Sequence, residues 1–336
     1  MSGQFNPLIS VVIPCYNVGR YIHGCLESVL AQTFRSFEVV CVNDGSSDNT
    51  LQEIEAFNDE RIRVITQKNR GLSGARNTGI NASRGIFVAL LDADDLWHPA
   101  KLESHFKHLQ TDSKIGISFS ASEFMDESGA PLGIGQHPKL KDITAKDIFC
   151  RNPIGNGSAP VMRKSLLTCV ARVKRFGNET RTEYFDETMR QSEDVEFWLR
   201  VALKTNYRIE GIAQALTYYR INMSGLSANL DDQYKSWLYS VEQNEKLDPQ
   251  FVKKWFPLAS AYQKRYLARR AVQARNPAAA LRLVKEALMQ DIRVLTEEPK
   301  RTLVTMVCSV LCMLPSALYQ KIEATGMKLQ SRSVAC

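Results

Sequence analysis

Residues 86–95 read IFVALLDADD, six apolar residues followed by three carboxylates within four positions. A run this apolar, without alternating polar residues, is typical of a strand buried on both faces of a parallel sheet. Three carboxylates so close together cannot all be buried and charged without a cation, because like charges raise one another's pKa. The segment therefore predicts a parallel sheet with a cation site at the end of one strand. A solvated acidic turn is the alternative.

The surrounding sequence repeats the order strand, polar loop, helix. Strands are predicted at 8–13, 37–42, 61–66 and 86–91, and helices at 21–31, 50–57, 73–82 and 99–109. Consecutive βαβ units of this kind indicate an α/β, Rossmann-like fold with a mainly parallel sheet flanked by helices. Residues 121–185 are less periodic and rich in Gly, Pro and Asn. A helix at 195–203 and two short strands at 208–212 and 216–219 complete the predicted domain.

The charge is unevenly distributed along the 336 residues. The chain carries 43 basic and 36 acidic residues, and residues 251–336 hold 15 of the basic and 5 of the acidic ones. From residue 231 onward the pattern becomes wholly helical, so we expect a catalytic domain at 1–230 and a helical C-terminal extension at 231–336. A basic extension suits an anionic membrane surface, and solvated helix faces are the alternative. Nucleic acid is not expected as a partner, because the basic excess lies outside the predicted sheet and lacks interleaved aromatic platforms of the usual kind.

The longest apolar run covers residues 302–314. As a helix it is about 20 Å long, less than the roughly 30 Å of a bilayer core, so we expect an interfacial rather than a spanning helix. The polar N-terminus lacks a secretory pattern, and the eight cysteines show no metal-binding spacing. These features predict a cytoplasmic protein, on the inner face of the membrane if the extension binds lipid.

Several polar clusters follow predicted strands, where ligands bind in sheets of this type. Asp92, Asp94 and Asp95 supply only oxygen ligands, which favour Mg²⁺ or Mn²⁺ held together with substrate phosphates. Tyr16, in the segment that starts at Pro14, offers a ring for stacking on a nucleobase. Asp44 offers acceptors for a base edge or ribose hydroxyl. Taken singly, each is more often an ordinary turn residue.

Two further groups carry candidate chemistry. Arg76 lies in a glycine-containing helix entry, GLSGAR at residues 71–76, which suits a diphosphate. Glu193 and Asp194 precede the bulky apolar pair Phe197 and Trp198, and such neighbours raise a carboxylate pKa toward the working range of a general base. A capping box formed by the residues that begin at position 192 is the alternative.

The whole set of motifs is more specific than its parts. In chain order they are ISVVIPCYN at 9–17, QTF at 32–34, NDGS at 43–46, the glycine segment 71–79, LDADDL at 91–96 and the pair at 193–194. In this order the chain closely resembles family 2 inverting glycosyltransferases of the GT-A fold, over about residues 7–225. The resemblance implies a nucleotide-sugar donor, most simply a UDP-sugar, bound over the sheet.

The resemblance also assigns roles to residues. It implies that Asp92, Asp94 and Asp95 form the D-x-D region, in which Asp94 or Asp95 ligates the metal, and that Asp194 deprotonates the acceptor hydroxyl. The donor site would comprise Pro14, Tyr16, Asp44, Arg76, Asp92 and Arg220. The acceptor site would be bordered by Asn156, Gly157, Ser158 and Glu193.

Two positions depart from the family pattern. Asn43 replaces the first acid of the D-D-G-S turn, and Asn222 stands where the family often has a His. The phosphate or metal contact of that His is then either missing or made by Arg220 or Ser224. The Q-x-x-R-W segment and long membrane spans of processive synthases are absent from the sequence. We therefore expect a non-processive transferase acting on a saccharide or lipid-linked acceptor. The alternatives are a catalytically silent nucleotide-sugar-binding scaffold and a nucleotidyltransferase.

Overall fold

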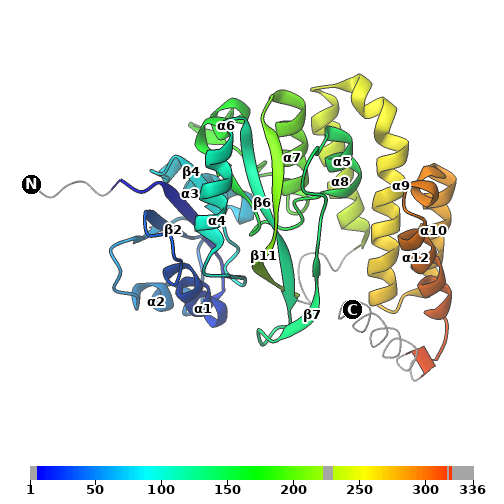
Figure 1. Ribbon diagram of the computed structural model, residues 1–336, viewed down its shortest axis with the longest axis horizontal. Helices are drawn as coiled ribbons and strands as arrows, with labels where there is room; N and C mark the ends of the chain where they lie inside the picture. Colours follow the sequence, from blue (N-terminus) through cyan, green and yellow to red (C-terminus); the bar gives the residue numbers. More distant parts are fainter. Residues whose placement is uncertain (1–5, 222–229, 316–317, 320–336) are drawn as a thin grey trace, which may run out of the picture. The chain divides into compact units, whose positions relative to one another are not determined.

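The computed structural model describes residues 6–221, 230–315 and 318–319 (Figure 1). The chain divides into two compact units, the first formed by 1–148 and 152–225 and the second by 149–151 and 226–336. The second unit therefore includes residues 149–151, whereas the predicted boundary between residues 230 and 231 assigns them to the catalytic domain. Asn222 and Ser224, named above as departures or replacements, lie outside the described residues.

The described part of the first unit is built on a nine-stranded sheet in the order β3-β2-β1-β4-β8-β6-β11-β5, with β7 paired to β6. Its strands are β1 Ile9–Cys15, β2 Phe37–Asn43, β3 Ile62–Thr66, β4 Phe87–Leu90, β5 Leu96–Trp97, β6 Ile115–Met125, β7 Pro131–Gln136, β8 Val161–Arg163 and β11 Arg208–Arg220. The pairs β1–β2, β1–β4, β2–β3 and β6–β11 are parallel, whereas β5, β7 and β8 run antiparallel to their neighbours. The predicted mainly parallel sheet is confirmed.

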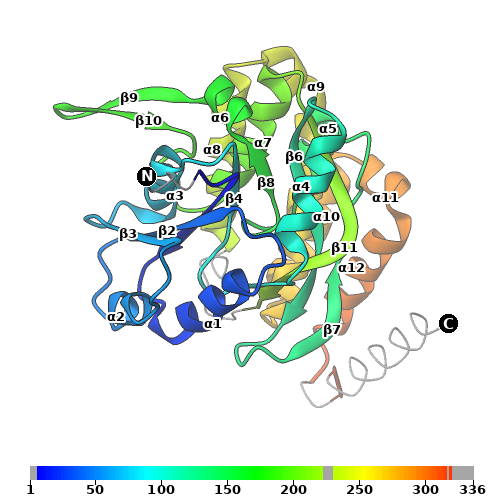
Figure 2. The same cartoon turned by 60° about the vertical axis from the view of Figure 1, so that its left-hand side comes forward.

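Helices cover both faces of this sheet, because successive strand residues point to opposite sides. On β2, Val39 and Cys41 pack into the cluster that includes α1 and α4, whereas Val40 and Val42 pack with Ala75 of α3. Figure 2 shows α1 and α2 on one side of these strands and α3 on the other. The helices are α1 Gly19–Leu30, α2 Thr50–Glu55, α3 Gly71–Ala82, α4 Lys101–Thr111, α5 Ala145–Arg151, α6 Lys164–Val170 and α7 Glu193–Lys204. A separate hairpin joins β9 Arg172–Phe176 to β10 Glu179–Glu183.

Helix α3 lies unusually close to strand β1. A Cβ atom added at Gly79 would lie 2.3 Å from a methyl carbon of Val12, well inside van der Waals contact. Only glycine therefore permits this separation between helix and strand. The close approach matters because α3 also carries Arg76.

The prediction of two short strands near the end of the domain was wrong. A single strand, β11, covers Arg208–Arg220, and its register against β6 shifts on both sides of Ala215. Residues 213 and 214 lie at this irregularity and are exposed. In the sequence they separate two strand-like runs, which is why a turn is expected there. The partner strand β6 extends into the region expected to be irregular, with buried serines at 118, 120 and 122 in place of apolar residues.

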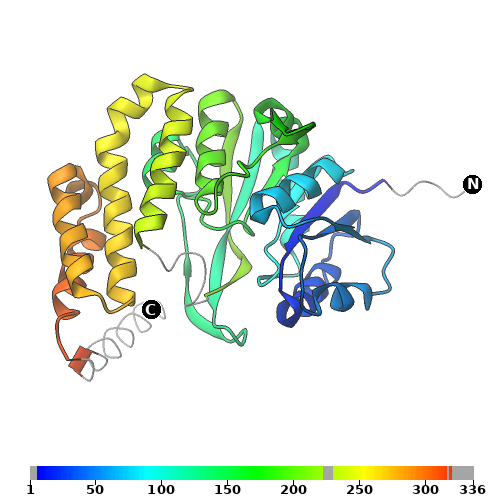
Figure 3. The same ribbon diagram turned by 180° about the vertical axis from the view of Figure 1, so that it is seen from behind.

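The described part of the second unit is helical, as predicted (Figure 3). Its helices are α8 Leu230–Glu245, α9 Pro249–Gln273, α10 Pro277–Gln290, α11 Arg293–Glu297 and α12 Pro299–Leu311. Asp248 and Asn276 accept hydrogen bonds from the first turns of α9 and α10, each of which begins with proline. Within residues 6–221, 230–315 and 318–319, no helix combines the length and apolar character needed to cross a bilayer.

Candidate active site

The ends of β1, β2 and β4 bring the predicted polar residues to one edge of the sheet. These strands are parallel neighbours, so the residues that follow them emerge on the same side. The loops are in contact, because the backbone N–H of Asp44 donates to the carbonyl of Cys15 (2.8 Å). Tyr16, Asp44 and the loop of residues 92–95, called here the acidic loop, therefore belong to one edge.

Pro14 and Tyr16 occupy the end of β1. Pro14 pairs with Val42 of β2, whereas the pairing of β1 with β4 stops at Val12. The missing N–H of Pro14 therefore leaves no gap in the hydrogen-bond ladder between β1 and β4. Tyr16 follows with 53% of its surface exposed. An open ring at this edge is suited to stacking on a planar base.

Asp44 holds the start of α3. Its carboxylate accepts hydrogen bonds from the backbone N–H groups of Arg70 (2.9 Å) and Gly71 (2.8 Å) and from the Gln67 side-chain amide (2.6 Å). Gly71 adopts a left-handed backbone with φ 76°, which lets the chain turn into the helix. The side chain is thus almost fully buried, and in this arrangement it stabilises a helix N-terminus.

Asp95 is buried within the protein framework. One carboxylate oxygen accepts from the Ser158 hydroxyl (2.5 Å) and the other from the backbone N–H of Arg220 (2.8 Å). Burial, followed by the charges of Asp94 and Asp92, raises the pKa of this carboxyl well above its usual range. Both oxygens therefore act in fixing the acidic loop to its neighbours.

The segment Asn156–Gly157–Ser158 supports the same loop from the other side. The Ser158 hydroxyl accepts from the backbone N–H of Asp92 (2.9 Å) while it donates to Asp95, and its own N–H donates to Asn156. Asn156 in turn donates to Ser122 of β6 (2.9 Å). Asn156 and Ser158 are buried. This part of the predicted acceptor border thus packs against the acidic loop.

Asp94 differs from its neighbours, because its carboxylate accepts from its own backbone N–H and, within the part of the chain that the structure describes, is not held by a distant residue as Asp92 and Asp95 are. Burial, followed by the charge of Asp92, raises the pKa of Asp94 to about 6, although Arg220 and Arg20 partly oppose the effect. A carboxylate whose charge is poorly balanced, beside a second carboxylate that is 24% exposed, fits a divalent cation with oxygen ligands. Among the described residues, no three acidic, His or Cys side chains are arranged so that they could hold a metal ion together, so a cation bound here would take further ligands from substrate phosphates.

Arg76 connects the acidic loop to the second acidic pair. Its guanidinium donates to Asp92 (2.7 Å) and to Glu193 at the start of α7 (2.8 Å), and it is 2% exposed. Gly157 leaves the necessary room, because a Cβ there would lie 2.3 Å from the Arg76 guanidinium and 2.8 Å from the Asp92 carboxylate. Arg76 therefore fixes the relative positions of two segments that lie about a hundred residues apart in the chain.

Asp194 has the electrostatics of a general base. Burial, followed by the adjacent charge of Glu193, raises its pKa to about 7, while Arg76 lowers it. Its carboxylate accepts one hydrogen bond, from the N–H of Val195 (2.8 Å). The Ser192 side chain makes no capping hydrogen bond, so the alternative of a capping box does not describe this helix start.

Arg220 is committed to backbone carbonyls. Its side chain donates to the carbonyls of Asp94 (2.7 Å), Asp126 (3.0 Å) and Glu127 (2.8 Å), and its guanidinium lies 4.8 Å from the Tyr21 ring centre. The residue is buried. It ties the end of β11 to the acidic loop from which the Asp94 side chain projects.

Sequence reasoning missed Lys101, which lies beneath the acidic loop. Its ammonium group is fully buried and donates to the Ala159 carbonyl (2.8 Å) and the Thr217 hydroxyl (3.1 Å). It also contacts His105 (3.3 Å), one helical turn along α4. Burial lowers the Lys101 pKa well below its usual range. The i, i+4 spacing of these two residues, in phase with buried Leu109, is a signal that could have found them.

Comparison with known proteins agrees with this geometry. The model of the glycosyl transferase family 2 matches residues 10–183, more than half of the chain. The chain belongs to glycosyltransferase family 2. Residues 10–183 contain the acidic loop, Arg76 and the Asn156–Ser158 segment.

Two relatives come from Bacillus subtilis strain 168. An uncharacterised glycosyltransferase, EpsJ, is 48% identical over 228 residues, which cover 66% of this chain and 63% of EpsJ. A putative teichuronic acid biosynthesis glycosyltransferase, TuaG, is 28% identical over 248 residues, which cover 73% of this chain and 91% of TuaG. Some relatives are much longer, and the chain spans 28% and 26% of the length of two of them.

Solved structures show that this family 2 member has the GT-A fold. S. aureus TarS 1-349, in complex with UDP-GlcNAc, matches with a TM-score of 0.57 at 20% identity, covering 90% of this chain and 88% of that one. The mannosyltransferase PcManGT from Pyrobaculum calidifontis, in complex with GDP-Man and Mn²⁺, matches with a TM-score of 0.57 at 20% identity, covering 92% and 86%. The expected GT-A architecture is confirmed.

Proposed function

We propose that this glycosyltransferase is an inverting, non-processive enzyme that moves one sugar from a nucleotide-sugar to a hydroxyl of a saccharide or lipid-linked acceptor. The observation that carries the proposal is the Arg76 bridge, which links the acidic loop to the helix start that presents Asp194. Inversion needs a base on the side of the acceptor and charge stabilisation on the side of the leaving group. The two acidic segments supply candidates for both.

Asp194 acts as the base in this proposal. A pKa of about 7 allows the carboxylate to take the proton of the acceptor hydroxyl near neutral pH. The hydroxyl oxygen then attacks the anomeric carbon from the face opposite the nucleotide, and the bond to the diphosphate oxygen breaks with its electron pair. No covalent bond to the enzyme is needed, because attack and departure take place on opposite faces of the sugar.

Asp94, assisted by Asp92, would hold the divalent cation. Mg²⁺ or Mn²⁺ bound there supplies positive charge against the diphosphate that departs. We assign Asp95, which uses both oxygens within the protein, to positioning rather than to metal binding. Ser158 and Arg220 are assigned to the same positioning role, since their hydrogen bonds hold the acidic loop.

The donor site would use Tyr16 for the base. Asp44 acts there by holding the N-terminus of α3, whose N–H groups favour anionic ligands. The guanidinium of Arg76 donates to the carboxylate of Glu193, and this pair fixes both side chains. We therefore assign Glu193 to positioning the base Asp194 rather than to binding the acceptor itself. Gly157 remains the candidate for the acceptor border, because it lies against both the Arg76 guanidinium and the Asp92 carboxylate.

We further propose a UDP-sugar donor, a cytoplasmic location and a role in cell-surface polysaccharide synthesis. Support for the donor comes from TarS, a fold neighbour in complex with UDP-GlcNAc, and support for the pathway class comes from TuaG. PcManGT, in complex with GDP-Man, makes a GDP-sugar the second donor to test. Nucleic acid is not part of the proposal.

The test is transfer and hydrolysis from UDP-, GDP- and dTDP-sugars with Mn²⁺, read out as released nucleoside diphosphate. We expect turnover with one nucleotide class, and loss of at least about a thousandfold in Asp194→Asn and Asp94→Ala while circular dichroism stays unchanged. NMR of the product anomer checks inversion. Donor binding without turnover by the wild type would favour the silent scaffold, and release of pyrophosphate from a sugar phosphate and a nucleoside triphosphate would favour a nucleotidyltransferase.

A further inference from the structure

Helix α12 has its polar and apolar faces reversed relative to an ordinary surface helix. Thr302, Thr305 and Ser309 are buried in the second unit. Their hydroxyls are satisfied locally, donating to the carbonyls of Val294 (2.7 Å), Arg301 (2.8 Å) and Thr305 (2.7 Å). The polar groups on the inner face are therefore compatible with burial, and the apolar residues of the helix are left outside.

The outward face of α12 is apolar along its length. More than half of the surface is exposed at each of Leu303, Val304, Val307 and Val310, and also at Met313, just past the end of the helix. Residues three or four apart lie on the same side of a helix, so these side chains form one stripe. Leaving so many large apolar residues together in water is costly, and such a stripe marks an interaction surface.

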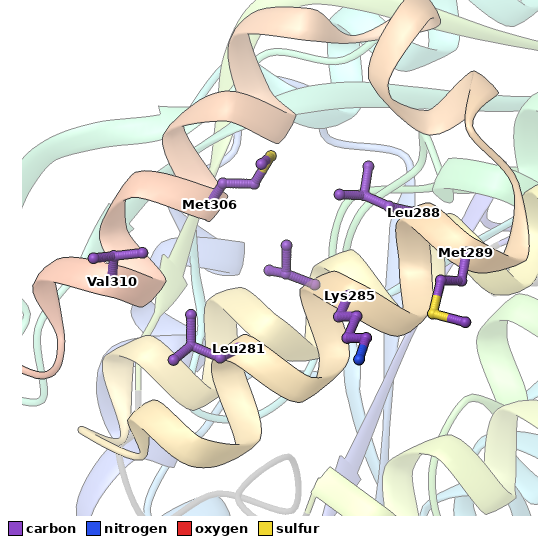
Figure 4. A pocket seen from close by; sticks show the side chains of 7 residues that line it. Leu281, Lys285, Leu288, Met289, Met306 and Val310 are labelled. Atoms are coloured by element: carbon purple, nitrogen blue, oxygen red, sulfur yellow. The ribbon is translucent and has the colours of Figure 1, made fainter.

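The stripe continues into a hollow between α12 and α10. The hollow has a volume of about 430 Å³ and is lined mainly by apolar side chains. Figure 4 shows Met306 and Val310 of α12 across from Leu281 and Leu288 of α10. We call the stripe and the hollow together the α10–α12 surface.

The charges around this surface are positive. Helix α12 contains no acidic residue, and Lys300 and Arg301 are exposed in its first turn. Lys285 of α10 lies at the hollow and is exposed. The nearby acids Glu286 and Glu298 are paired, because Glu286 pairs with Lys264 (3.3 Å) and Glu298 pairs with Arg265 and also with the exposed Arg301 (3.4 Å). An apolar stripe with a cationic border is therefore left.

We propose that the α10–α12 surface docks on an anionic phospholipid bilayer. The apolar stripe would lie at the acyl boundary, while Lys285, Lys300 and Arg301 contact acidic headgroups. A two-fold dimer through the same surface would place these cations against their own copies, which opposes association. The surface therefore complements a negative partner rather than itself. This goes beyond the transfer reaction and does not depend on it.

The test is flotation of the full-length protein with phosphatidylcholine vesicles that contain or lack about one third phosphatidylglycerol. We expect binding to the anionic vesicles that weakens as salt rises from about 0.05 to about 0.5 M. Each Lys→Gln change at 285 or 300 should lower the partition coefficient roughly fivefold. Val304→Asp with Val307→Asp should lower it at least about tenfold.

The control is Val173→Asp, which changes a still more exposed valine, on the β9–β10 hairpin of the first unit, and should bind as the wild type does. Asp194→Asn should also bind normally, so a failure of the catalytic proposal leaves this result unaffected. Absence of vesicle binding by the wild type overturns the proposal. So does unchanged binding by the double Asp variant, or a wild-type dimer in sedimentation velocity that the same variant dissociates without any vesicle binding.

Discussion

Asp194→Asn should make the protein more stable while it removes the proposed base. The folded-state pKa of Asp194 is about 7, against an ordinary value of 3.8, chiefly because the carboxyl is buried and lies beside Glu193. At about 1.4 kcal/mol per pKa unit, ionising this group in the folded protein costs roughly 4 kcal/mol as an upper value. The asparagine side chain keeps the oxygen that accepts from Val195 but carries no charge.

The sign of the pH dependence follows from proton binding. Between about pH 4 and pH 7 the folded protein holds this proton and the unfolded chain does not, so wild-type stability falls as the pH rises. The Asp194→Asn variant has no titrating carboxyl at this position, so its stability does not fall in this way. We expect equal free energies of unfolding for the two proteins near pH 4 and an advantage for Asp194→Asn, up to roughly 4 kcal/mol, at pH 8.

The assay is guanidinium chloride denaturation followed by tryptophan fluorescence, in the presence of a chelator, at several pH values. Asp48→Asn is a control of opposite sign. Its carboxylate accepts from the Gly19 N–H and from Thr50, and the pKa of Asp48 is lowered. That variant should therefore lose stability at pH 8 relative to acid pH. A constant difference between Asp194→Asn and wild type across the pH range would refute the reasoning.

Three further predictions concern the residues around the site. Ser158→Ala removes the hydroxyl shared by the acidic loop and should destabilise the protein by about 1–3 kcal/mol in thermal or chemical denaturation, whereas an unchanged midpoint would contradict its positioning role. Gly157→Ala should lower transfer more than tenfold, because the new methyl group displaces Arg76 from Asp92; steady-state kinetics and the Tm together separate this from unfolding. Because the pKa of Lys101 is lowered in the folded protein, the free energy of unfolding of the wild type should increase as the pH rises toward 10. Lys101→Met lacks this increase, so its stability relative to the wild type should fall with pH. Parallel plots of unfolding free energy against pH for the two proteins would exclude this.

The sequence predicts the sheet well, and it places the acidic loop at the end of a strand, because both features depend on local pattern. The apolar run at 86–91 and the acids after it give a strand and a loop without any knowledge of distant residues. Likewise, the bulky apolar neighbours of Asp194 are enough to predict a raised pKa, which the structure shows. A property of a residue that depends only on its neighbours in the chain can be predicted from the sequence in this way.

What depends on long-range contacts is not accessible from pattern alone. The carboxylates of Asp94 and Asp95 are adjacent in sequence, yet only Asp95 is held by Ser158, more than sixty residues away. The bridge from Arg76 to Glu193 spans 117 positions. In the same way, the sequence of β11 predicts two strands, whereas its pairing with β6 shows that the interruption at Ala215 is a shift of register within one strand.

The absence of a side chain at Gly79 limits how this enzyme can be altered. Any larger residue there must push α3 outward from Val12, and the guanidinium carried one turn earlier on that helix moves with it. A programme that randomises the residues of the proposed donor site to change sugar preference should therefore leave position 79 untouched, although glycine has no side chain that could contact a ligand. Loss of activity in a variant substituted at position 79 would result from displacement of helix α3 as a whole and would give no information about sugar recognition.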